Sequence, residues 1–192
     1  MRRPRALLIG GAPGTGKSTL AAALAPRIGA AVLDLDVATG PLTDVISRLL
    51  GVADLGDPRI AELTRAPRYH TQLALAEDNQ RAGLSVVVVA PFTAERSAGW
   101  TAVADRLAAH AAGPTLVWLH LPAHVLVERL GRRDAARDTD KVKDPDAFLA
   151  ALDDSPPAAP HLALDATEPV TDLVDRVLAH LARHGLAIDG TP

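Results

Sequence analysis

A glycine-rich pattern near the N-terminus is the feature that most constrains the fold of this chain. Residues 11–18, Gly-Ala-Pro-Gly-Thr-Gly-Lys-Ser, fit the phosphate-binding pattern G-x-x-x-x-G-K-[ST] at every fixed position. The pattern lies between the apolar run Ala6–Ile9 and the helix-forming run Leu20–Ala25. A buried strand, a glycine loop and a helix, in that order, are the context in which this pattern binds phosphate. The sequence therefore predicts an α/β domain with a phosphate-binding loop.

The residue types of this loop predict its ligands. Glycines adopt positive φ angles and bring bare backbone close to a ligand, and the loop amides and the following helix N-terminus favour phosphate oxygens. Lys17 is predicted to reach the β- and γ-phosphates of ATP, and the Ser18 hydroxyl to ligate Mg²⁺. The alternative is an accidental glycine-rich turn. We expect the cofactors ATP and Mg²⁺ and a nucleotide-binding set made of Gly11, Ala12, Pro13, Gly14, Thr15, Gly16, Lys17, Ser18 and Thr19.

Length and composition limit the classes of protein that fit. The chain has 192 residues, which is enough for one domain and too few for two ordinary ones, so we expect a single domain over residues 1–192. A net charge of −3 and 3% aromatic residues argue against nucleic-acid and anionic-membrane partners. The absence of cysteine excludes disulfides and thiol catalysis, and no apolar run reaches the length of a membrane span. We expect a cytoplasmic monomer or homodimer.

Strand patterns and helix patterns alternate along the whole chain. This alternation predicts a five-stranded parallel sheet with helices on both faces. The predicted strands are residues 6–9, 31–36, 84–90, 115–120 and 162–164. The predicted helices after the glycine loop are residues 42–50, 67–82, 93–112, 122–130 and 170–184.

Two aspartates end the second predicted strand. Asp34 and Asp36 are two residues apart, so on a strand their side chains would share one face. In open parallel sheets, ligands bind beyond the carboxyl ends of the strands, and this end should neighbour the glycine loop. One carboxylate would hold Mg²⁺ through water, and the other would accept the proton of an attacking hydroxyl. The alternative is that one of the two caps the following turn.

With this glycine loop followed by Asp-x-Asp, the chain resembles the P-loop small-molecule kinases, such as shikimate kinase, gluconate kinase and chloramphenicol phosphotransferase. The resemblance implies a P-loop NTPase fold of the nucleoside/shikimate-kinase type. It also implies that Asp36 is the base for the substrate hydroxyl and that Asp34 is the outer-sphere magnesium aspartate. One departure is the strand Val86–Ala90, which lacks the acid that many P-loop NTPases carry there. That departure places more weight on Asp34.

An arginine-rich segment follows the fourth predicted strand and its helix. In the resembled kinases the corresponding segment is a lid, which here would cover about residues 131–155. The resemblance implies that Arg129 lies against adenine and that Arg133 and Arg137 clamp phosphates, with Arg132 as the substitute for Arg133. Arginine forks suit the equatorial oxygens of a transferring phosphoryl group. The alternative is a solvated helix end with Arg–Asp ion pairs.

The acceptor side is predicted from position. In the resembled kinases, helices after the second strand form the acceptor pocket, which points to Arg65, Arg68 and Tyr69. Phe92, after the third strand, is expected to face the same cleft, with Glu95 nearby. Either arginine would bind an anionic group of the acceptor, and the alternative is that each is a surface arginine, which is the commoner role of this residue type. Thr167 and Glu168 follow the last strand, where the resembled kinases wrap the adenine.

Together, these patterns predict an ATP-dependent kinase that phosphorylates a hydroxyl of a small molecule. The catalytic residues would be Lys17, Asp36, Arg133 and Arg137. A different class of protein, a nucleotide-binding regulator without phosphotransfer, fits the same loop. A polynucleotide 5′-kinase and a toxin-like sugar-nucleotide kinase are further alternatives. The sequence names neither the acceptor nor a preference for ATP over GTP.

Overall fold

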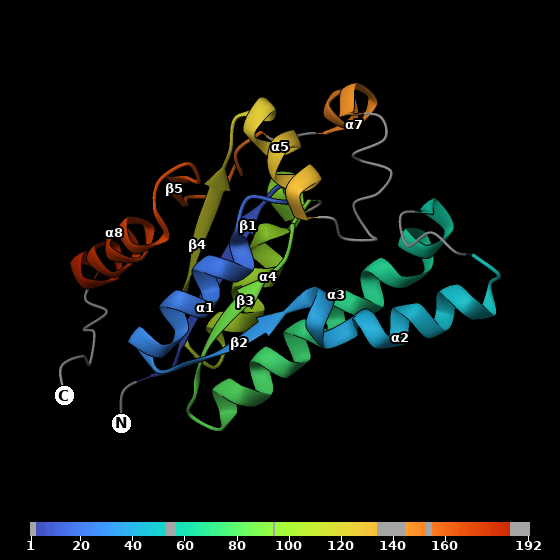
Figure 1. The fold of residues 1–192 in the computed structure, drawn as a ribbon. Coiled ribbons are helices and arrows are strands. Elements are labelled where there is room, and N and C mark those ends of the chain that lie inside the picture. The colour runs from blue at the N-terminus through green and yellow to red at the C-terminus, as the bar shows by residue number, and fades with distance from the viewer. Residues whose placement is uncertain (1–2, 53–56, 94, 134–144, 153–154, 185–192) are drawn as a thin grey trace.

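The fold is built on one all-parallel, five-stranded sheet, as the alternation predicts (Figure 1). The computed structural model describes residues 3–52, 57–93, 95–133, 145–152 and 155–184. The strand order is β2-β3-β1-β4-β5, so the strand before the glycine loop is central. The strands are β1 (Arg5–Gly11), β2 (Ala30–Asp34), β3 (Ser85–Val89), β4 (Ala112–His120) and β5 (Leu162–Asp165).

Helices connect the strands and cover both faces of the sheet (Figure 1). None of the helices in the described ranges is both long enough and apolar enough to cross a membrane. They are α1 (Lys17–Ile28), α2 (Leu35–Leu49), α3 (Pro58–Arg81), the π-helical turn η1 (Glu95–Gly99), α4 (Trp100–Ala108), α5 (Ala123–Arg133), α7 (Pro145–Ala151) and α8 (Val170–Arg183).

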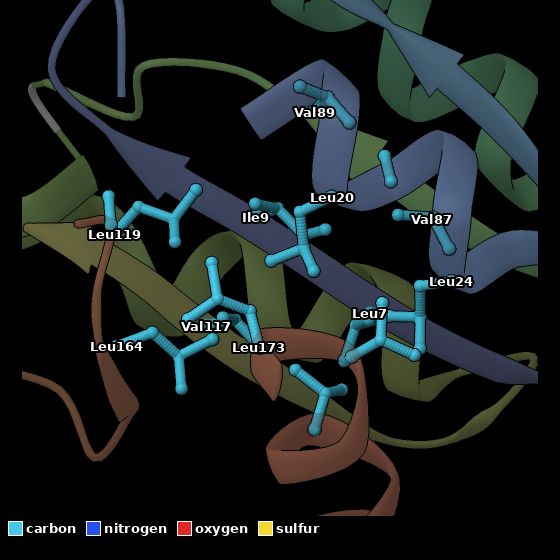
Figure 2. Packing of buried hydrophobic residues seen from close by; sticks show 14 of the residues in the cluster. Leu7, Ile9, Leu20, Leu24, Val87, Val89, Val117, Leu119, Leu164 and Leu173 are labelled. Atoms are coloured by element: carbon cyan, nitrogen blue, oxygen red, sulfur yellow. The ribbon is translucent and has the colours of Figure 1, made fainter. Parts of the chain in front are cut away.

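Two apolar cores lie on the two faces of the sheet, because successive strand residues point to opposite sides. On β1, Leu7 and Ile9 face one core, which α1 and α8 cover, with α5 above it (Figure 2). Ala6 and Leu8 face the other core, which α3 and α4 cover. β1 and β3 are therefore continuous apolar runs, as expected for strands that are buried on both faces.

Several predicted boundaries are wrong for identifiable physical reasons. Asp34 and Asp36 do not share a strand face, because β2 ends at Asp34 and α2 begins at Leu35. Helix α3 begins nine residues before Pro67, since Asp57 caps it and Pro58 takes the first-turn position that favours proline. The predicted helix 93–112 is instead the turn η1 and the shorter α4, and Gly113 lies inside β4.

The lid prediction for residues 131–155 is only partly covered by the described residues. Its second half contains helix α7, which the sequence did not predict. Phe148, Leu149 and Leu152 in this half pack against the core that α1 and α8 cover. Most of the first half, residues 134–144 with Arg137, lies outside the described residues.

Candidate active site

The glycine loop between β1 and α1 adopts a conformation that requires its glycines. Gly11, Gly14 and Gly16 have φ angles of 137°, 83° and 91°. A Cβ atom on Gly11 would lie 2.4 Å from the Leu119 carbonyl oxygen, so no other residue fits there. At Gly16 a Cβ would meet no atom within 4 Å, and the loop is therefore open on that side. This open side is where a phosphate can approach the backbone amides.

Lys17 lies with its ammonium at the mouth of the loop. Its Nζ donates hydrogen bonds to the carbonyl oxygens of Gly11, at 2.9 Å, and Ala12, at 2.8 Å. Thr15 is almost fully buried, and its hydroxyl donates to the same Ala12 carbonyl at 2.9 Å. The loop thus positions the lysine charge beside its own amides, where bound phosphate oxygens would need it.

Ser18 and Asp34 join the glycine loop to the end of β2. The Ser18 hydroxyl donates to Asp34 Oδ2 at 2.6 Å. The other carboxylate oxygen of Asp34 accepts from the backbone N–H groups of Asp36, at 2.9 Å, and Val37, at 3.4 Å. Asp34 is therefore the N-cap of α2 and the partner of Ser18 at once. A hydroxyl beside a carboxylate is a set of hard oxygen donors, which fits Mg²⁺.

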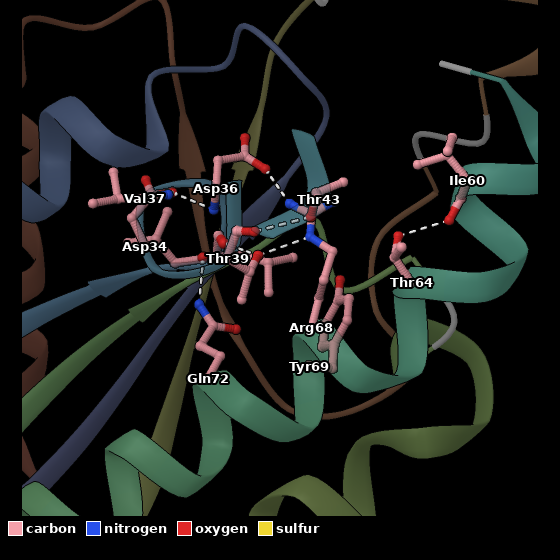
Figure 3. A network of polar contacts seen from close by, with 12 residues as sticks. Asp34, Asp36, Val37, Thr39, Thr43, Ile60, Thr64, Arg68, Tyr69 and Gln72 are labelled. Atoms are coloured by element: carbon pink, nitrogen blue, oxygen red, sulfur yellow. Dashed lines mark hydrogen bonds and ion pairs between the residues drawn. The ribbon is translucent and has the colours of Figure 1, made fainter. Parts of the chain in front are cut away.

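Asp36 lies in the first turn of α2 and pairs with Arg68 of α3 (Figure 3). Arg68 Nη2 donates to Asp36 Oδ1 at 2.6 Å, and Arg68 Nε donates to the Thr39 hydroxyl at 2.8 Å. The Asp36 side chain is still 51% exposed, whereas that of Arg68 is 25% exposed. The arginine thus orients a carboxylate that remains accessible to a reactant. Sequence reasoning missed Thr39, which has no motif of its own.

Gln72 is a second residue that sequence reasoning missed. It is fully buried, and its Nε2 donates to the carbonyl oxygens of Leu33 and Val89, each at 2.8 Å. These carbonyls lie at the ends of β2 and β3, so Gln72 ties together two strand ends at the site (Figure 3). The available signal was its position one helical turn after Arg68 on α3.

Arg65, Tyr69 and Phe92 do lie together, but two of them are packing residues. The Arg65 guanidinium lies 3.3 Å from Glu95 Oε2 and 5.3 Å from the centre of the Tyr69 ring. The Tyr69 hydroxyl accepts from the Phe92 N–H at 2.9 Å, and burial raises the pKa of Tyr69 to about 12. Phe92 is 1% exposed and contacts Tyr69 and Trp100 edge-on. The expectation that Phe92 faces a cleft is therefore wrong.

Two separate segments that were predicted to lie near adenine do lie next to each other. Arg129 of α5 donates from Nη2 to the Ala166 carbonyl at 2.8 Å. Ala166 begins the loop after β5, which also contains Thr167 and Glu168. Arg132 is mostly exposed and pairs with Glu128 at 2.6 Å, as an ordinary surface ion pair would. Arg133 is the last residue of α5, and its side chain, like Arg137, lies outside the described residues.

A parallel sheet with a G-x-x-x-x-G-K-S loop after its central strand defines a P-loop nucleotide-binding domain. Residues 7–157 match the family AAA_33, described as an AAA domain, and the chain belongs to this family. The fold implied by the resemblance to P-loop kinases is thereby confirmed. A search of curated proteins found no sequence match.

Solved structures of several kinases share this fold over nearly the whole chain. A sugar kinase from Janibacter sp. is 22% identical, with a TM-score of 0.63 and coverage of 93% of this chain and 95% of that chain. An APS kinase from Mycobacterium tuberculosis, in complex with AMPPNP and APS, is 20% identical, with a TM-score of 0.62 and coverage of 95% and 99%. A gluconokinase from Sinorhizobium meliloti is 24% identical, with a TM-score of 0.60 and coverage of 96% and 95%. At these identities the similarity establishes the fold.

Proposed function

We propose that this protein is an ATP-dependent kinase that transfers the γ-phosphoryl group to a hydroxyl of a small molecule. One observation carries the proposal. Asp34 ends β2 and Asp36 lies in the first turn of α2; the first carboxylate is bonded to Ser18 of the glycine loop, and the second is accessible and held by an arginine. Phosphoryl transfer to a hydroxyl requires a phosphate site, a metal-binding pair and an accessible carboxylate. Here all three lie together at the carboxyl ends of the strands.

The nucleotide side of the proposal uses the loop residues 11–19. Lys17 would move from the loop carbonyls to the β- and γ-phosphates, and the loop amides would bind phosphate oxygens. Ser18 would ligate Mg²⁺ directly, and Asp34 would hold it through water. When bound, the ion neutralises charge on the phosphate oxygens. Arg129, at the loop after β5, would lie against the adenine.

The acceptor side uses Asp36 as the base. The acceptor oxygen bonds to the γ-phosphorus while the bond from that phosphorus to the β,γ-bridging oxygen breaks. The hydroxyl proton passes to the Asp36 carboxylate, and ADP leaves. Arg68 holds this carboxylate in place, and Arg65 lies nearby beside Glu95. Tyr69 and Phe92 support these residues from the core rather than bind the acceptor themselves.

The remaining parts of the proposal concern the lid and the partner. Arg133 and Arg137 would clamp the transferring phosphoryl group, within a single domain that spans residues 1–192. A small hydroxylated acceptor is favoured over a nucleic acid by the net charge of −3 and the 3% aromatic content, because strand-binding grooves are basic and rich in stacking side chains. The named sugar kinase and gluconokinase of the same fold support this class of acceptor.

The test is ADP release from ATP·Mg²⁺ across a panel of hydroxylated metabolites, antibiotics and one 5′-hydroxyl oligonucleotide. We expect one class of small molecule to raise ADP release above the ATP-only rate. Nucleotide binding without any acceptor-dependent release would instead favour a regulatory protein, and release with the oligonucleotide alone would favour a polynucleotide kinase.

Asp36→Asn then tests the base. The variant should retain nucleotide affinity and lose ~10²–10⁴-fold in kcat, which is the range for a positioned general base. Asp44→Asn is the matched control, since Asp44 is exposed on the same helix and should leave kcat unchanged. A near-normal kcat for Asp36→Asn would refute this role for Asp36.

A further inference from the structure

Helix α2 presents an apolar stripe to solvent. Its residues recur at i, i+3, i+4, i+7 and i+8, the spacing that places side chains on one face of a helix. Such a face normally packs against the protein core. Here the side chains are exposed: Leu42 by 69%, Val45 by 40%, Ile46 by 36%, Leu49 by 81% and Leu50, which follows the helix, by 44%.

The buried face of α2 is polar instead. Thr39, Thr43 and Ser47 are the side chains buried along the rest of the helix after Leu35. Each hydroxyl is satisfied within the α2 region, on the carbonyl oxygens of Leu35, Thr39 and Val52 at 2.5, 2.9 and 2.5 Å. α2 packs against α3 along this face, on the side of the sheet where β2 is the edge strand (Figures 1 and 3). The apolar stripe therefore adjoins this buried face, and its side chains are left in solvent.

We infer that this stripe, residues 42–50 of α2, is the interface with a second copy of this chain. A leucine-sized side chain carries on the order of 100 Å² of apolar surface, so the stripe exposes roughly 300 Å² per copy. This is within the range of the largest apolar patch on a typical monomer, and such patches are often functional. A stable interface covers about 800 Å² per partner, with an apolar centre and a polar rim. The stripe supplies the apolar centre, and the polar flanks of α2 and α3 supply the rim.

A second copy fits the stripe better than the other occupants do. Helices that lie on membranes carry lysine and arginine on their polar face, whereas the charged residues of α2 are Asp36, Asp44 and Arg48. Within the same chain, the longest segment outside the described residues is 134–144, whose charged residues are four aspartates, two lysines and one arginine. In most homodimers a two-fold axis brings the same surface of both copies together, so the stripe of one copy would pack against the stripe of the other.

The pairing geometry predicts which residues meet. In an antiparallel, two-fold pair the residues at the centre of the stripe lie next to their own copies. The centre of residues 42–50 is Ile46, and Arg48 is an exposed residue of α2 outside the stripe. Because Asp36 lies in the first turn of α2, such a pairing would also hold the helix that carries the candidate base. The inference itself does not depend on the proposed reaction.

The first experiment is the mass of the full chain in solution, by light scattering and sedimentation, from 1 to 100 µM. We expect twice the chain mass of 20.0 kDa. The double variant Leu42→Asp/Leu49→Asp should weaken the dimer at least ~100-fold, as expected for two central interface residues. Arg48→Asp is the matched control, because it adds the same charge to the same helix and should leave the dimer intact. Leu42→Gln/Leu49→Gln repeats the test if the aspartates unfold the helix.

A second experiment uses the absence of cysteine from this chain. Ile46→Cys should give a disulfide-linked dimer on mild oxidation, and Arg48→Cys should give several-fold less. A wild-type chain that is monomeric at 100 µM, or a dimer that the stripe variants leave unchanged, would overturn the inference. Binding of the monomer to anionic lipid vesicles would overturn it in favour of a membrane surface.

Discussion

Two buried glutamines on α3 provide a matched pair for testing how the strand ends at the site are held. Gln72 and Gln80 are 0% and 3% exposed on the same helix. The Nε2 of Gln72 donates to Leu33 and Val89, whereas neither amide atom of Gln80 has a hydrogen-bond partner among the described residues. Replacing each glutamine by methionine keeps the length of the side chain and its helix propensity nearly constant.

The expected effects have opposite signs. Gln72→Met removes two hydrogen bonds and leaves two carbonyls without this donor. It also removes the buried Gln72 Oε1 atom, which has no hydrogen-bond partner among the described residues, and this partly offsets the loss. At about 1 kcal/mol per net hydrogen bond, plus the cost of the unpaired carbonyls, we expect a net loss of about 2 kcal/mol. Gln80→Met removes a buried amide without partners, so it should be neutral or stabilise the fold by up to about 1 kcal/mol.

The assay is urea unfolding of both variants beside the wild type, with thermal melting as a second measurement. The two variants should differ by about 2–3 kcal/mol, or roughly 4–12 °C in melting temperature for a domain of this size. Equal destabilisation by both variants would show that burial alone, and not the bonds to Leu33 and Val89, sets the cost. A neutral Gln72→Met would refute the role of Gln72 in holding the strand ends.

Two further predictions concern Tyr69 and Lys17. Burial raises the pKa of Tyr69 to about 12, against about 10 for an unfolded tyrosine, so the folded state keeps the proton to higher pH and loses stability as pH rises above 10. The stability of wild type relative to Tyr69→Phe should therefore fall by roughly 1 kcal/mol between pH 9 and pH 11 in urea unfolding, and a constant difference would contradict this. Lys17→Ala should abolish ATP turnover, because the β- and γ-phosphates lose the lysine of the loop. Arg27→Ala, at the other end of α1, should not change turnover in the same ADP assay, and turnover of Lys17→Ala within a few-fold of wild type would rule out the loop assignment.

The order of the strands and helices could be predicted because its signals are local. The central strands are apolar on both faces, and the glycine loop is recognised by residue types at fixed positions. The boundaries were less predictable where capping decided them. β2 ends at Asp34 because its carboxylate accepts hydrogen bonds from the first N–H groups of α2. The spacing of Asp34 and Asp36 fits both a strand that continues through Asp36 and a helix that Asp34 caps.

The sequence by itself determined that a phosphate-binding loop follows a buried strand and that two aspartates lie at the end of the next strand. Only the tertiary structure decided that Arg68 holds Asp36, that Gln72 joins two strand ends, and that Phe92 turns into the core. The hydrogen-bond partners of Asp36 and Gln72 are 17 or more residues away from them in the chain, so their meeting depends on how whole helices dock. The same docking decided which side of α2 is buried, since packing against α3 placed its threonines inward and its leucines in solvent. A periodic pattern defines the two faces of a helix, but only its neighbours determine which face water contacts.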